Sequence, residues 1–137
     1  MATLRRDVLT SASPSQVWDA IRDIGALHTR LVPGFVLDTQ VEGRVRTVTF
    51  ANGMIIREPI VSCEDDVMRL VWTAEGGSLL HYNGSAQVFD RGKVTCVTWT
   101  ADFLPDDAEA DIAALMDAGA KAMAVALDCL AEKSVVG

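Results

Sequence analysis

Arg46 and Glu58 are two residues whose types and spacing could do chemistry. They flank an Asn-Gly pair at positions 52–53, which is typical of a tight turn between two β-strands. A three-residue loop there pairs Phe50 with Met54, and counting back along both strands places Arg46 opposite Glu58. Because opposite side chains on one face lie within about 5.5 Å, we expect an ion pair between the guanidinium and the carboxylate.

The same register decides which way this pair points. It sets Val48 opposite Ile56, and both belong with Phe50 to the apolar face of the hairpin. Arg46 and Glu58 should therefore face inward as well. Taking charges out of water costs several kcal/mol per ion unless they are well paired. Two interpretations stay open: a structural ion pair near the end of the sheet, open to water, and a polar anchor for a ligand.

Aromatic residues continue this inward band along the chain. Counting through the next two turns places Glu58 opposite Trp72, and Trp72 opposite Tyr82. The last turn places Gly84 opposite Trp99, and the missing side chain of the glycine leaves room. Aromatic rings with one carboxylate and one hydroxyl suit a flat ligand with few polar groups. For each tryptophan alone, ordinary core packing is the competing interpretation.

Seven strands and three helices are expected to position these residues. Ser13-Pro14-Ser15-Gln16 has the residues of a helix start with a capping box, and a second short helix is expected over residues 26–31. A long Ala-rich helix is expected over residues 107–133, about 40 Å at 1.5 Å per residue. Alternation and turn signals predict strands over residues 4–10, 35–41, 44–50, 54–64, 67–75, 78–90 and 93–104.

The long helix carries its apolar side chains on one stripe, which should cover the open face of the antiparallel sheet. A sheet curled around a single helix tends to leave a cavity, here expected to exceed about 300 Å³, the low end for ligand pockets. Trp72, Tyr82 and Trp99 should line it from the sheet. The stripe that should face them comprises Ile112, Leu115, Met116, Gly119, Met123, Leu127 and Leu130.

Composition narrows the functional class. At 137 residues the chain is expected to form one domain, residues 1–137, and half of its residues are hydrophobic, which argues against disorder. A net charge of −7 argues against binding to nucleic acid or to anionic membranes. The sequence has neither an apolar run of transmembrane length nor the apolar region of a signal peptide, so we expect a cytoplasmic protein without membrane insertion.

Metal and cofactor sites are not indicated. His28 and His81 lie in separate predicted elements, and the odd number of cysteines lacks a CxxC motif, so neither a zinc site nor a disulfide framework is expected. His81 falls in the solvated phase of its strand. His28 lies near the expected mouth of the pocket, where a role as general base or ligand donor competes with a purely structural one.

Several segments carry a family resemblance: residues 13–21, 43–46, 52–53 with 57–58, 82–85 and 97–101. In these segments the chain resembles the helix-grip proteins of the START-like superfamily, also called SRPBCC. This group includes polyketide cyclase/dehydrase-like proteins, pollen-allergen-like proteins and abscisic acid receptors. The resemblance implies an α+β fold: a seven-stranded curved antiparallel sheet around a long C-terminal helix, two short helices after the first strand, and an internal cavity. It also implies that Glu58 lies in the ligand cavity.

Three functions follow from these observations. The first is binding of a small hydrophobic or aromatic molecule, as a carrier or a sensor. The second is an enzyme of the aromatase/cyclase or dehydratase type, with Glu58, Tyr82 and Arg46 in acid–base and positioning roles. The third is a cavity-poor domain that acts through protein contacts, for example as a homodimer. The expected ligand-binding residues are Arg46, Val48, Ile56, Glu58, Trp72, Tyr82, Gly84, Trp99, Leu115, Gly119 and Met123.

Overall fold

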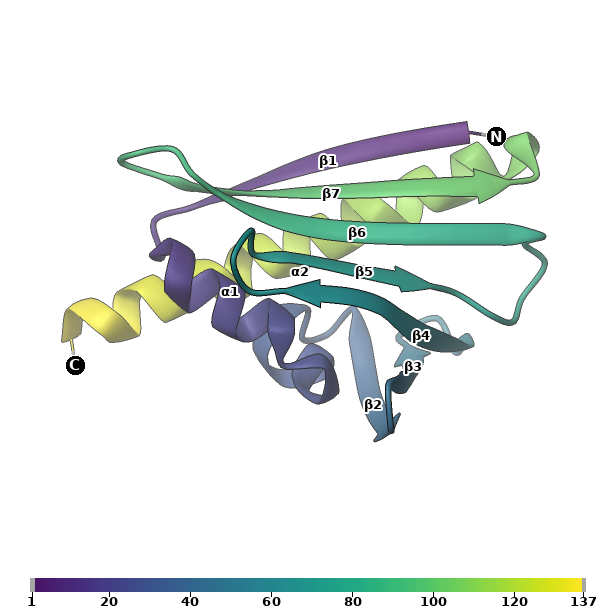
Figure 1. The fold of residues 1–137 in the computed structure, drawn as a ribbon, viewed down its shortest axis with the longest axis horizontal. Helices are drawn as coiled ribbons and strands as arrows, with labels where there is room; N and C mark the ends of the chain where they lie inside the picture. The colour runs from purple at the N-terminus through teal and green to yellow at the C-terminus, as the bar shows by residue number, and fades with distance from the viewer. Residues whose placement is uncertain (1, 137) are drawn as a thin grey trace.

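One curved antiparallel sheet forms the frame of the molecule (Figure 1). The computed structural model describes residues 2–136. The strand order across the sheet is β1-β7-β6-β5-β4-β3-β2, so chain neighbours pair as hairpins from β2 to β7 and the first strand closes against the last. The strands are β1 (Ala2–Thr10), β2 (Val36–Glu42), β3 (Val45–Phe50), β4 (Ile55–Glu64), β5 (Arg69–Thr73), β6 (His81–Asp90) and β7 (Thr95–Leu104).

Short helices follow β1. Helix α1 (Pro14–Arg22) begins at the predicted capping box, in which the Ser13 hydroxyl accepts from the Gln16 amide and the Gln16 side chain accepts from the Ser13 amide. The predicted helix over residues 26–31 is two single turns instead, a 3-10 turn η1 (Ile24–Ala26) and a π-helical turn η2 (Leu27–Leu31).

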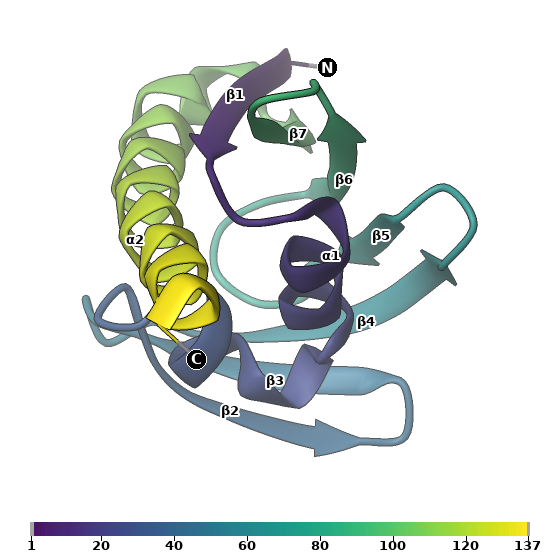
Figure 2. The same cartoon turned by 90° about the vertical axis from the view of Figure 1, so that its left-hand side faces the viewer.

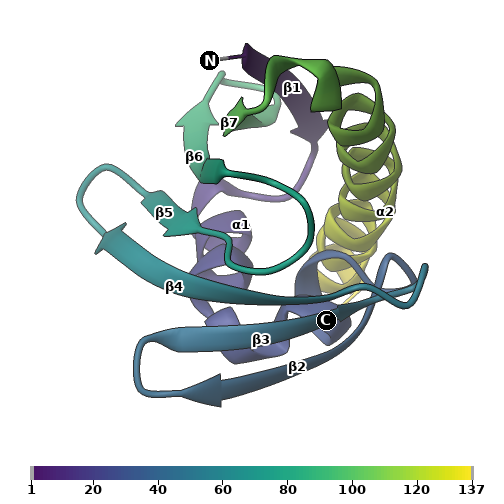
Figure 3. The ribbon, with the colours of Figure 1, turned by 90° about the vertical axis from the view of Figure 1, so that its right-hand side faces the viewer.

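The long helix α2 (Glu109–Val136) follows a 3-10 turn, η3 (Asp106–Ala108), and covers the concave face of the sheet (Figures 2 and 3). Its predicted stripe points into the core, where Met116, Met123 and Leu127 are almost fully buried. On the outer side, the Arg6 Nε of β1 donates to the Asp117 carboxylate at 2.6 Å. The helix is therefore fixed both by apolar burial and by a link to the edge strand.

The register of the Asn-Gly hairpin is as predicted: Arg46 pairs with Glu58 and Val48 pairs with Ile56. The next three predicted pairings are each wrong by two residues. Trp72 lies opposite Ile60 and Gly84. Gly84 in turn lies opposite Ala101, and Trp99 lies opposite Ala86.

The positions of the turns explain these errors, because the centre of each turn lies further along the chain than the sequence predicts. Between β6 and β7, for example, the Arg91 amide donates to the Val94 carbonyl, so that the loop spans four residues. Between β4 and β5 the shift would be odd, but a β-bulge at Val61 takes up one residue. Every pairing error is thus two residues. Because side chains alternate between the two faces with period two, a shift of two residues keeps the inward-facing residues inward.

No helix within residues 2–136 is long and apolar enough to cross a membrane.

Candidate functional site

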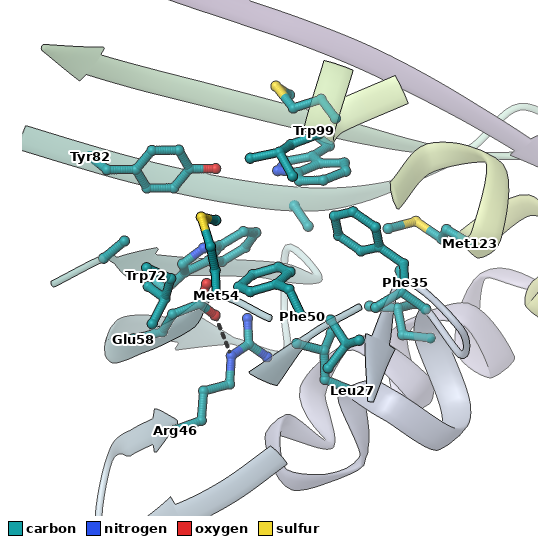
Figure 4. A pocket seen from close by; sticks show the side chains of 18 of the residues that line it. Leu27, Phe35, Arg46, Phe50, Met54, Glu58, Trp72, Tyr82, Trp99 and Met123 are labelled. Carbon is teal, nitrogen blue, oxygen red and sulfur yellow. Dashed lines mark hydrogen bonds and ion pairs between the residues drawn. The ribbon is translucent and has the colours of Figure 1, made fainter. Parts of the chain in front are cut away.

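A cavity of about 140 Å³ lies between the concave face of the sheet and helix α2 (Figure 4). Its wall is largely apolar, and its aromatic side chains are Phe35, Phe50, Trp72, Tyr82 and Trp99. The volume is about half the 300 Å³ expected from the fold. The difference has a physical cause, since bulky side chains of β3, β7 and the segment before β2 project into the space that a curved sheet leaves.

Most of the sequence-predicted residues lie in this wall, and three do not. Val48 is fully buried in the core, behind the lining. Gly84 lies beneath Trp72, where an added Cβ would come within 2.6 Å of the indole, and Gly119 would similarly come within 2.9 Å of Trp99. The two glycines therefore allow the tryptophans to lie flat rather than lining the cavity themselves. The predicted residues in the wall are Arg46, Ile56, Glu58, Trp72, Tyr82, Trp99, Leu115 and Met123.

One end of the cavity, formed by the short helices and the start of β2, was not predicted from the sequence. Leu27 and Leu31 line it from η2, and Phe35 and Phe50 meet there edge to face with ring centroids 5.4 Å apart. The spacing of Leu27 and Leu31 was the available signal, because residues four apart share one face of a helical segment. Nothing local in the sequence indicates that Phe35 turns inward before β2 begins.

The Arg46–Glu58 pair forms the polar part of the wall. Arg46 Nε donates to Glu58 Oε1 at 2.8 Å, and the two residues are only 3% and 7% exposed. The guanidinium carbon also lies 5.3 Å from the centroid of the Trp72 ring, a cation–π contact. Burial raises the pKa of the Glu58 carboxyl above its usual range, and the adjacent Arg46 charge offsets this only in part.

A raised pKa predicts how stability depends on pH. The unfolded chain releases the Glu58 proton near pH 4.5, whereas the folded chain holds it to higher pH. The protonated Glu58 carboxyl therefore contributes its full stabilisation of the fold below pH 4.5, and this contribution is lost as the pH rises through the folded-state pKa. We expect the free energy of unfolding of wild type, minus that of Glu58→Gln, to decrease between pH 4.5 and 8 in urea titrations. An increase over this range would contradict the raised pKa.

Tyr82 and Trp99 form a second polar edge. Burial, and next the negative charge of Glu58, raise the pKa of the Tyr82 hydroxyl, which stays protonated over the physiological range. Figure 4 shows this hydroxyl and Trp99 Nε1 directed toward one another. Trp99 lowers the Tyr82 pKa slightly in return, although within residues 2–136 Trp99 Nε1 makes no hydrogen bond of good geometry.

His28 and His81 lie outside the cavity wall. His81 is exposed at the start of β6, as its strand phase predicted. His28 Nδ1 is 3.1 Å from the Thr39 hydroxyl of β2, so the imidazole joins η2 to the sheet. Across residues 2–136, no cluster of three or more His, Cys, Asp or Glu side chains could hold a metal ion.

A curved antiparallel sheet closed by one long helix, with a largely apolar cavity between them, defines the helix-grip architecture of the START-like superfamily. A family model described as polyketide cyclase / dehydrase and lipid transport matches residues 1–134. The chain therefore belongs to this family.

Solved structures agree with this fold. The protein XoxI from Bacillus cereus is 22% identical, with a TM-score of 0.81, over 93% of this chain and 96% of its own. Zhui aromatase/cyclase from a Streptomyces species is 17% identical, with a TM-score of 0.76, over 98% and 95% of the two chains. A START superfamily protein from Mycobacterium smegmatis is 11% identical, with a TM-score of 0.77, over 93% and 98%. The search of curated proteins found no match.

Proposed function

We propose that this protein binds a small hydrophobic or aromatic molecule in the internal cavity, as a carrier or a sensor. The observation that carries the proposal is the cavity itself, with its largely apolar wall and its short polar edge. Few well-placed polar groups in an apolar enclosure are typical of small-molecule sites. The family description, which includes lipid transport, supports the same class of function.

The size of the cavity sets the probe for a test. An apolar cavity of about 150 Å³ holds one benzene ring, so a monocyclic hydrocarbon suits the volume of about 140 Å³ found here. We expect ethylbenzene to shift the methyl NMR resonances of Leu115 and Met123, which line the cavity, and to leave those of the exposed Leu9 unchanged. Equal shifts at all three, or none, would contradict an internal site. Native mass spectrometry of protein purified gently from its own host would then identify the natural ligand.

A second candidate function is an aromatase/cyclase- or dehydratase-type enzyme. The observation that favours it is the Glu58 carboxyl, which lies in the cavity wall with a raised pKa, the direction in which burial tunes a carboxyl for acid–base catalysis. The similarity in fold to an aromatase/cyclase is consistent with this chemistry. The two functions differ in the fate of the ligand, because a carrier releases it unchanged and an enzyme releases a product. Incubating the co-purified molecule with wild type and with Glu58→Gln distinguishes them.

A further inference from the structure

The indole N–H of Trp99 is a buried donor that makes no hydrogen bond of good geometry within the described chain. The Tyr82 hydroxyl lies close enough for Trp99 to lower its pKa, but the two groups do not reach that geometry. The indole N–H of Trp18 in α1, by contrast, donates to the Asp65 carboxylate at 2.8 Å. Buried polar groups are nearly always paired, because an unpaired donor costs more than a typical hydrogen bond contributes. The Trp99 N–H can therefore still form a well-aligned hydrogen bond with an added acceptor.

The packing of Trp99 directs this N–H toward the cavity. Gly119 of α2 lies against the six-membered ring, where an added Cβ would come within 2.9 Å of Cη2 and Cζ3. The indole is thus held by the edge that carries no nitrogen. The opposite edge, with Nε1, faces the Tyr82 hydroxyl, and both residues line the cavity (Figure 4). An oxygen atom placed there would meet two donors, and a carbonyl oxygen has two lone pairs.

Charge decides between a neutral and an anionic ligand. Within the described residues, Arg46 is the only cationic side chain in the wall, and Glu58 already neutralises it. An anionic ligand would lie unpaired in a low-dielectric space, and the Glu58 charge, which acts on the neighbouring Tyr82 hydroxyl, would repel it. The site therefore favours a neutral acceptor.

We propose that the ligand is a neutral molecule with one aromatic ring and a carbonyl group, whose oxygen accepts a hydrogen bond from Trp99 Nε1. This inference rests on the proposed function and specifies its ligand class. The ring fits the cavity volume of about 140 Å³, and the carbonyl group supplies the missing acceptor.

The test compares two probes of nearly equal shape, acetophenone and α-methylstyrene, which differ by a carbonyl oxygen in place of a methylene group. We expect Trp99→Phe to lower the ratio of their affinities, acetophenone over α-methylstyrene, by about tenfold in NMR titrations, the effect expected of one hydrogen bond to a buried donor. A general change in cavity size alters the affinities of both probes alike, so its effect cancels in the ratio. Trp72→Phe is the matched control, because it shortens a wall tryptophan and leaves the Trp99 N–H in place.

Wild-type protein gives a second readout that does not depend on a folded variant. The indole N–H proton of Trp99 should move downfield with acetophenone and not with α-methylstyrene. An unchanged ratio in Trp99→Phe, or an equal change in Trp72→Phe, would overturn the inference while leaving hydrophobic binding intact. Tighter binding of benzoate than of acetophenone at pH 7 would overturn the neutral ligand. Failure of both probes to bind would overturn the proposed function itself.

Discussion

Arg46→Leu is expected to lower the free energy of unfolding by about 3–5 kcal/mol, the cost of removing one partner of a buried ion pair. The substitution leaves the Glu58 carboxylate in the cavity wall without the Arg46 Nε that donates to it at 2.8 Å. It also removes the cation over the Trp72 ring. Urea denaturation at pH 7, followed by circular dichroism, measures the loss.

Two comparisons show whether the loss of stability comes from the unpaired charge of Glu58. Arg46→Leu combined with Glu58→Leu should recover most of the stability, because buried ion pairs are often replaced by apolar residues without cost. The single variant should also lose less stability at pH 4 than at pH 7, since a protonated Glu58 carries no unpaired charge. A loss below about 1 kcal/mol at pH 7, the range of exposed ion pairs, would show that water reaches the pair in solution.

The fold was predictable because its signals are local and repeat along the chain. The capping box at Ser13 and the apolar stripe of α2 each depend on residues within a few turns of one another. The Arg46–Glu58 pairing depended only on the Asn-Gly turn, and it is confirmed. Alternation within strands then assigned the inward faces correctly even where the pairing was wrong.

Exact pairings and the shape of the cavity were not predictable, because they depend on interactions between distant segments. The bulge at Val61 has no distinctive sequence and appears only when β4 pairs with β5. Gly84 and Gly119 were expected in the lining, but each lies behind a tryptophan that covers it. Phe35 reduces the cavity from a segment whose path is set by packing on α2 and β3. Volume is thus a property of the assembled core rather than of any one motif.

Ala86→Leu is expected to abolish ligand binding while preserving the fold. Ala86 lies on the inward face of β6, opposite Trp99, and its methyl group forms part of the cavity wall. Leucine places three more carbon atoms in the space that a single aromatic ring would occupy. We expect the affinity for ethylbenzene to fall about 100-fold or more, equivalent to about 2.8 kcal/mol.

Stability and binding should separate in this variant. Overpacking a dense core costs about 1–3 kcal/mol, but here the added carbons enter empty space, so thermal unfolding should shift little or toward higher temperature. Ser85→Leu is the matched control, since it adds a leucine to the opposite face of the same strand and should leave ethylbenzene binding unchanged. If Ala86→Leu binds ethylbenzene as wild type does, the ligand lies elsewhere on the protein. If both variants lose binding equally, the effect comes from the strand as a whole, and the cavity is not the site.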